Sequence, residues 1–348
     1  GDVYKRQVYH LSVPHHYYSY NSGQFRVEEY KKPEFEVSTQ VPDKPLKVGD
    51  QVYVTLNAKY YYGQPVSQAT VNYKIFRHDH AEQWYPWTRW DWLYGNGYWW
   101  SAYDYNWYPG FKNWGCRAPL PHWYPQPQSA PELVAENTLN IPANGELKIK
   151  LDTQLAKQLY GHKDHRYEIQ AEVTDASRRT ISGSTSVLVT RHPYKVYAWV
   201  DKGYYQGGDT VKASFKAQTA QKMPVTGKGK ITLYRIDYDA KGSPEEKAIH
   251  TWKARSNKRG EVTQTFVVTR EGQYRITLIL EDEKGNKQTG AYLFNVIGHG
   301  NNSKPLRFNP LEVIPDQREY RVGNQASLLI NTEQTDSTVL LFERPVNG

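Results

Sequence analysis

The chain has 348 residues, of which 38% are hydrophobic, 14% aromatic and 23% charged. This length exceeds one ordinary β-sandwich and suits two to three domains of about 100 residues each. The 44 Lys and Arg residues against 36 Asp and Glu give a net charge of +8, but the basic residues are scattered without a basic block, so we do not predict nucleic-acid binding. No apolar run reaches 18 residues, so we do not predict membrane insertion.

The first residues predict the closing strands of a domain. "VYHLSV" from Val8 and "GQFRVEEY" from Gly23 resemble the last two strands of the repeats further along the chain. We therefore expect residues 1–31 to be the C-terminal strands of a truncated preceding domain. Residues 1–7 match nothing in the repeats, and neither an initiator Met nor a signal peptide is present, which indicates a fragment that has lost its export signal.

Residues 32–191 predict the first complete domain. Apolar and polar residues alternate in two successive runs after Lys47, the period of two that is typical of half-buried strands. The Gly-Gln-Pro-Val sequence from Gly63 is a turn signal between these runs. A further hairpin from Asn137 and a closing strand pair from His165 bring the count to about seven short strands, as in an immunoglobulin-like sandwich.

An insertion at about residues 82–131 interrupts this domain. Nine of the 11 tryptophans lie in it, and its Pro, Gly and Trp content excludes a regular helix or strand over most of its length. Two interpretations remain open: an exposed aromatic platform for a sugar or protein partner, or tryptophans packed on one another and against the sandwich like an Ω-loop. The candidate surface residues are Trp87, Trp90, Trp92, Trp99, Trp100, Trp107, Trp114 and Trp123.

Residues 192–298 repeat the pattern, and residues 305–348 begin it again. Gly followed by Asp or Asn opens all three copies, in the stretches that start at Lys47, Gln206 and Arg321. We expect a second complete domain and the N-terminal part of a truncated third one. The predicted fold is therefore all-β, with tandem seven-stranded antiparallel β-sandwich domains of immunoglobulin-like type.

The junction between the first two units carries a family resemblance. "GQFRVEEYKKPEFEV" from Gly23, followed by "VGDQVYVTLNAKYYYGQPVSQATVNYKIFR" from Val48, resembles the junction of the second and third macroglobulin domains of the alpha-2-macroglobulin family, most closely its bacterial branch. The resemblance extends over essentially the whole chain. It implies that residues 32–191 and 192–298 are third-like and fourth-like macroglobulin domains from the N-terminal half of a protease trap. In such a trap, cleavage of a bait segment by a protease makes the domains collapse round that protease.

Reactive chemistry is not predicted for this chain. The family's thioester needs a run of the Gly-Cys-Gly-Glu-Gln type, whereas the single cysteine, Cys116 in "NWGCRAPLP", has no Gln three residues on, so we expect a packed thiol, no thioester and no intrachain disulfide. "RHDH" from Arg77 and "GHKDHR" from Gly161 pair His with Asp, but we expect them to lie at strand ends or turns, solvated or mutually hydrogen-bonded, without a metal. No bait segment, catalytic residue or cofactor is assigned, and we predict that the chain is not an enzyme.

Two classes of function follow. The first is the non-catalytic structural arm of an alpha-2-macroglobulin-like endopeptidase inhibitor, with proteases as partners of the longer protein and other domains of the same chain as direct partners. The alternative is an extracellular adhesin or carbohydrate-binding array that uses the Trp-rich insertion. The lack of disulfides favours a bacterial envelope protein, extracellular or periplasmic, over a cross-linked animal plasma protein.

Overall fold

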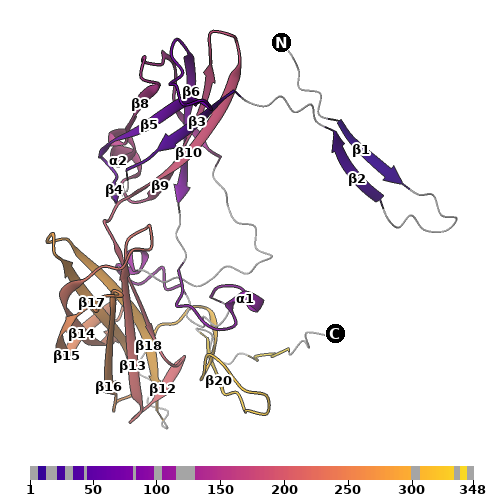
Figure 1. Ribbon diagram of the computed structural model, residues 1–348. Helices are drawn as coiled ribbons and strands as arrows, with labels where there is room; N and C mark the ends of the chain where they lie inside the picture. Colours follow the sequence, from indigo (N-terminus) through magenta and orange to yellow (C-terminus); the bar gives the residue numbers. More distant parts are fainter. Residues whose placement is uncertain are drawn as a thin grey trace.

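The computed structural model describes residues 7–12, 22–27, 34–42, 45–80, 84–97, 104–114, 130–298, 306–332 and 338–342. Within these ranges most regular structure is β-strand, and the strands build two complete sandwiches that lie one above the other in Figure 1. Among the helices of these ranges, none is long and apolar enough to cross a membrane.

The first sandwich places a three-stranded sheet against a five-stranded sheet. The three-stranded sheet has the order β3 (Phe35–Gln40), β5 (Gln51–Tyr60), β8 (Glu146–Asp152). The five-stranded sheet has the order β4 (Leu46–Lys47), β10 (Thr180–Thr190), β9 (Asp164–Thr174), β6 (Thr70–His80), β7 (Glu132–Asn140). A short helix, α2 (Gln154–Tyr160), connects β8 with β9. Alternate residues of these strands are buried between the sheets, as the period of two predicts.

The second sandwich has the same topology. Its three-stranded sheet has the order β11 (Lys195–Val200), β13 (Thr210–Gln218), β16 (Glu261–Val267). Its five-stranded sheet has the order β12 (Tyr204–Gln206), β18 (Lys287–Ile297), β17 (Gly272–Asp282), β14 (Gly227–Tyr238), β15 (Pro244–Arg255). The all-β sandwich class predicted from the sequence is confirmed by this arrangement.

The first strand of each sandwich is divided between its two sheets. In the first sandwich β3 pairs with β5 in one sheet, and the chain then crosses to form β4 beside β10 in the other. In the second sandwich β11 and β12 divide in the same way. Seven strands therefore appear as eight segments, and β4 and β12 run parallel to β10 and β18 in sheets whose other pairings are antiparallel.

Three matching tight turns open the three repeats, at residues 47–50, 206–209 and 321–324. In each turn the backbone amide of the fourth residue donates a hydrogen bond to the carbonyl of the first residue, at 2.9 to 3.0 Å. The fourth side chain, Asp or Asn, accepts a hydrogen bond from the first amide at 2.9, 3.1 and 2.7 Å respectively. The third residue is a glycine with φ of 104°, 95° and 89°, which favours glycine because other side chains are strained there. The repeated Gly-Asp or Gly-Asn pair is thus a shared turn.

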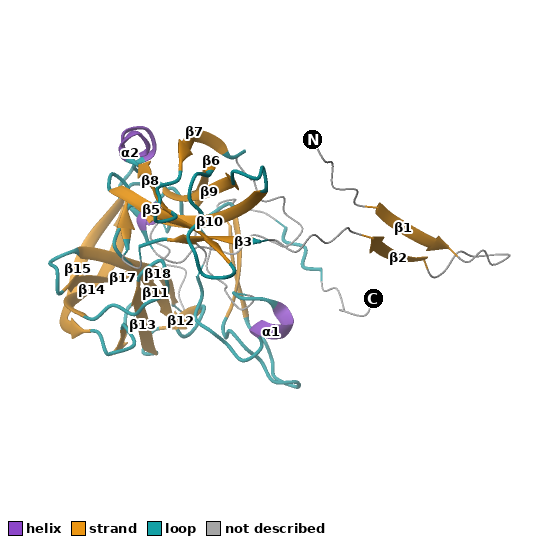
Figure 2. Ribbon diagram, turned by 45° about the horizontal axis from the view of Figure 1, so that its top comes forward, coloured by secondary structure: helices purple, strands orange, loops and turns teal. Residues whose placement is uncertain are grey.

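Short elements lie at both ends and in the insertion. β1 (Gln7–Ser12) and β2 (Ser22–Val27) form an antiparallel hairpin, apart from both sandwiches in Figures 1 and 2. β19 (Leu311–Pro315) and β20 (Leu328–Thr332) form another hairpin beside the second sandwich. The insertion contributes one turn of helix, α1 (Asp91–Tyr94), and one 3-10 turn, η1 (Phe111–Asn113).

Candidate functional site

The insertion leaves the first sandwich after β6 and packs on the second sandwich. Among the described residues of the insertion, none belongs to the first sandwich's core, whereas Tyr85 is part of the second sandwich's core and Trp84 packs against it. Of the two interpretations left open by the sequence, the packed loop is therefore wrong in its partner, because the described residues pack on the neighbouring sandwich and not on their own. The physical reason is that strands of the first sandwich already fill its core, while the second sandwich offers apolar residues on an outer face.

One contact joins the start of the insertion to β11. The Trp84 ring lies 4.5 Å from the ring of Tyr197 and 5.7 Å from that of Trp199. Tyr85 is buried beside them and beside Gly97, where an added Cβ would lie only 2.6 Å from the Tyr85 ring. Gly97 also has a φ of 84°, so both the close approach and the backbone require glycine at this bend.

A second contact covers the outer face of the five-stranded sheet of the second sandwich. Phe294 of β18 points into the core and its neighbour Leu293 points outward, as alternation along a strand requires. The buried residues of this outer cluster are Tyr105, Tyr108, Phe111, Trp114, Ile236, Ala291 and Leu293. Trp114 is 8% exposed, and its ring centroid lies 5.1 Å from that of Phe111.

The tryptophans of the insertion thus divide into two groups. Trp114 is buried and Trp107 packs against the outer cluster, whereas Trp87 and Trp92 are 80% and 77% exposed. Trp90 is at the border of exposure, with the Arg89 guanidinium 4.7 Å above its ring. The three remaining candidates, and the single cysteine, lie outside the described residues: Trp99, Trp100, Trp123 and Cys116.

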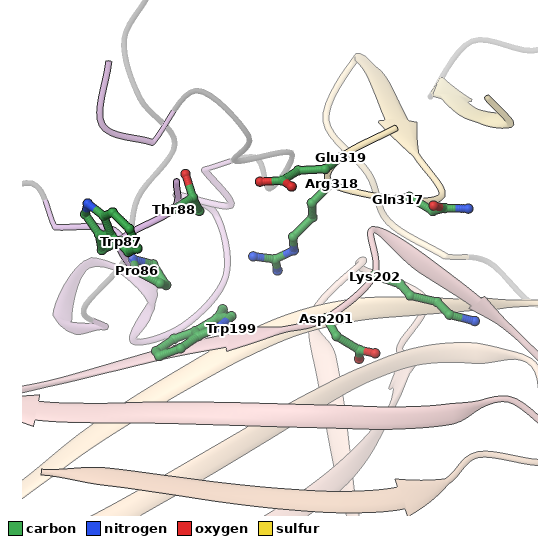
Figure 3. A pocket seen from close by; sticks show the side chains of 9 residues that line it. All are labelled: Pro86, Trp87, Thr88, Trp199, Asp201, Lys202, Gln317, Arg318 and Glu319. Carbon is green, nitrogen blue, oxygen red and sulfur yellow. The ribbon is translucent and has the colours of Figure 1, made fainter. Parts of the chain in front are cut away.

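Trp87 of the exposed group borders an open pocket of about 570 Å³ to which three parts of the chain contribute. Its lining comes from the insertion, the end of β11 with the turn after it, and the turn after β19: Pro86, Trp87, Thr88, Trp199, Asp201, Lys202, Gln317, Arg318 and Glu319. In Figure 3, Arg318 points from one side toward Trp199 on the other. The Arg318 guanidinium donates to the Val200 carbonyl, and Lys202 Nζ lies 3.0 Å from Asp209, so both cations have partners within the protein.

Strand pairing brings the two His/Asp sequences together. In the register of β6 and β9, Asp79 lies opposite His165 and His80 opposite Asp164. His165 is fully buried, and this burial lowers the pKa of its imidazole. Asp164 and His165 lie at the start of β9, so the strand-end position expected from the sequence is confirmed, but both side chains are buried and the expected solvation is wrong for them. Across the described ranges, no group of three His, Cys, Asp or Glu side chains could hold a metal ion.

Asp164 fixes the linker between the sandwiches. Its carboxylate accepts a hydrogen bond from the Arg191 amide at 2.9 Å and lies 2.9 Å from Lys195 Nζ. Burial opposes ionisation of Asp164, but Lys195 and the Arg191 amide outweigh it and hold the pKa of the carboxyl below its ordinary value. From the other side, the buried Tyr194 hydroxyl lies 2.7 Å from the Leu280 carbonyl, to which it donates. Sequence reasoning missed this anchor, although a proline-flanked Tyr194 between two strands could have indicated it.

The comparisons with known proteins agree with the sequence resemblance. No family model matches the chain. An alpha-2-macroglobulin homolog of Nostoc is 22% identical over 359 residues, which cover 93% of this chain and 16% of that protein. Alpha-2-macroglobulin of Thermotoga maritima is 37% identical over 71 residues, 20% of this chain and 4% of that one.

Among solved structures, native E. coli alpha-2-macroglobulin aligns over 94% of this chain and 20% of its own, at 12% identity and a TM-score of 0.40. Because that score is low, the fold assignment rests on the strand pairing described above. The chain spans about a sixth or less of the curated relatives that it matches. The similarity to bacterial alpha-2-macroglobulins predicted from the sequence is confirmed.

Proposed function

We propose that this chain, which is similar to a bacterial alpha-2-macroglobulin homolog along 93% of its length, is part of the structural arm of a protease-trapping protein of that type. The observation that carries the proposal is this similarity, which extends through both sandwiches and the linker between them. In this role the chain is not an enzyme, and it holds no bait segment or thioester. The protein that contains it is exported to the periplasm or the cell exterior and meets proteases there.

Residues 32–191 and 192–298 are, in this proposal, the third-like and fourth-like macroglobulin domains. Residues 1–31 and 305–348 then belong to the domains before and after them. The linker at 191–194 is short and is held by Asp164 on one side and by Tyr194 on the other. Such a joint supports an arm that transmits movement between neighbouring domains without itself carrying out chemistry.

The test of this proposal uses the longest natural protein that contains this chain. It is incubated with trypsin, and the remaining peptidase activity is measured on a small chromogenic substrate and on a large protein substrate. Steric trapping predicts that cleavage of the large substrate is lost while cleavage of the small one is retained. Trypsin mixed with the heat-unfolded protein is the control, and unchanged cleavage of both substrates after confirmed nicking would contradict the proposal.

The exposed tryptophans favour a second candidate function, binding of a saccharide. Trp87 and Trp92 present large aromatic faces to solvent, and such faces stack on sugar rings. Isothermal titration of the chain with soluble peptidoglycan fragments tests this candidate. Loss of binding in Trp87→Ala and Trp92→Ala, but not in the control Leu155→Ala on exposed α2, would support it, and absence of binding in the parent chain would exclude that ligand.

A further inference from the structure

We propose that residues 104–114 of the insertion are an interdomain docking segment whose binding partner is residues 306–332 of the same chain. The first sandwich thereby holds the unit that follows the second sandwich. This inference goes beyond the proposed function because it assigns a partner to part of the insertion, and it does not depend on protease trapping.

The docking segment is itself anchored on the second sandwich. Its aromatic rings cover the outer face of β14 and β18, and the Tyr108 hydroxyl donates a hydrogen bond to Glu246 on β15. Glu246 also accepts from Arg275, with 2.6 Å between Nε and Oε1. Burial opposes ionisation of Glu246, but the bonds from Arg275 and Tyr108 outweigh it and lower its pKa. A charged network therefore fixes the segment on the second sandwich.

The partner presents a buried carboxylate to the segment. Glu312 of β19 has no exposed surface, and its carboxylate accepts a hydrogen bond from the Tyr105 hydroxyl at 3.3 Å. Its other donors are the Asn309 amide at 3.0 Å and Asn331 Nδ2 at 3.2 Å, both within the partner. A buried carboxylate is costly unless hydrogen-bond donors surround it. Among the donors in the described ranges, Tyr105 is the one from outside the partner, 207 residues away in the chain.

Trp107 supplies a second set of contacts. Its Nε1 donates to Asn309 Oδ1 at 3.3 Å, and Asn309 Nδ2 donates to the Asp104 carbonyl at 3.4 Å. The Arg307 guanidinium lies 4.4 Å above the Trp107 ring and also donates to the Gly242 carbonyl at 3.1 Å. Arg307 therefore joins the partner to the insertion and to the second sandwich at once, and cation–π stacking adds to the hydrogen bonds.

The partner needs such support because its described strands form only a two-stranded hairpin. An isolated hairpin of this kind is marginally stable in water. Contacts independent of the insertion exist as well: Gly203 lies against the Pro315 carbonyl so closely that a Cβ would clash, and Arg318 bonds the Val200 carbonyl. The docking segment therefore adds to an existing contact and determines how firmly the hairpin is held.

Hydrogen exchange of the whole chain, read by mass spectrometry, tests the proposal. In Tyr105→Phe, which keeps the ring and removes the hydroxyl, amide exchange in β19 and β20 should accelerate on the order of tenfold, as expected when a buried charged group loses one donor. Trp107→Leu should accelerate exchange in the same two strands. The double variant Tyr105→Phe with Glu312→Gln should accelerate exchange by less than the product of the two single accelerations, because both substitutions weaken the same hydrogen bond.

Tyr194→Phe is the matched control. It also removes a buried tyrosine hydroxyl, but this hydroxyl donates to the Leu280 carbonyl of the second sandwich and does not contact residues 306–332. Its effect should appear in β17 and not selectively in β19 and β20. Exchange in β19 and β20 that stays within twofold of the parent in both Tyr105→Phe and Trp107→Leu, or that rises equally in Tyr194→Phe, would overturn the proposal.

Discussion

The two sandwiches share one topology and differ most in one connection. This is the connection that follows β6 in the first sandwich and β14 in the second. In the second sandwich a five-residue turn at 239–243 joins β14 to β15, and the Asp239 side chain bonds the amides of Lys241 and Ser243 at 2.8 and 2.7 Å. In the first sandwich the same position carries the insertion between β6 and β7. Because no described residue of the insertion belongs to the core of the first sandwich, that sandwich does not need the insertion.

The comparison teaches that a long loop can be ordered by its neighbour. The insertion supplies aromatic residues to the second sandwich and hydrogen bonds to the unit after it. An element that is encoded in one domain thus stabilises the next two. The predictions below change one member of this comparison at a time.

Grafting the short turn into the first sandwich should have the largest effect. Residues 81–128 are replaced by Asp-Ala-Lys-Gly-Ser, the sequence of 239–243. We expect the first sandwich to keep its stability, whereas the second should lose on the order of 5 kcal/mol because several buried aromatic contacts disappear. Hydrogen exchange resolves the two sandwiches, and greater loss in the first than in the second would contradict the comparison.

A single substitution, Trp114→Ala, should destabilise the second sandwich by about 3 kcal/mol. The removed ring is buried against Phe111 and Tyr108, and the cavity that remains adds to the lost burial. Trp92→Ala is the matched control, since this ring is exposed and its removal should change stability by less than about 0.5 kcal/mol. Urea unfolding of both variants measures the difference, and equal midpoints would contradict it.

Asp164→Asn should weaken the joint that fixes the linker. The amide keeps the shape of the carboxylate but loses the charge that Lys195 pairs with, so we expect the first sandwich to lose about 2 kcal/mol. Small-angle scattering should show a wider spread of distances between the sandwiches. Glu172→Gln, an exposed charge on the same strand, is the control and should leave both measurements unchanged.

Mild acid should affect the first sandwich more than the second. The pKa of buried His165 is below its ordinary value of about 6.5, so the unfolded chain binds the proton more readily than the folded chain does. The stability contribution is therefore complete above about pH 6.5 and is lost as the pH falls below it. Urea unfolding between pH 7 and 5 measures this loss, which His165→Gln should reduce. A loss in His165→Gln equal to that of the parent would contradict the assignment.

Local features of the fold could be predicted from the sequence, and long-range ones could not. The turns at Gly49, Gly208 and Gly323 could be predicted from a repeated pair of residues. The glycine allows the positive φ of the turn, and the Asp or Asn after it provides the side chain that closes the turn. The burial of His165 depends on its register with Asp79, which lies on another strand. The residues of "GHKDHR" alone could therefore not predict that His165 is buried.

The candidate site shows the same limit. High tryptophan content predicted that the insertion is either packed or a binding surface, and among the described residues Trp114 is packed whereas Trp87 is exposed. The surface that covers Trp114 is formed by Ala291 and Leu293, about 180 residues further along. Their outward position is visible only once β18 is placed in its sheet, so the partner of the insertion could not be read from the sequence.

The divided first strand determines how each sandwich bears mechanical load. β12 runs parallel to β18, the strand that leaves the same sandwich, and is joined to it through residues 204–206 and 295–297. A tension applied to the two ends of the sandwich pulls these strands in opposite directions along their length. The hydrogen bonds between them are then loaded together in shear and do not open one after another like a zipper. β4 and β10 repeat the arrangement in the first sandwich, so the tandem array resists stretching at two points in series.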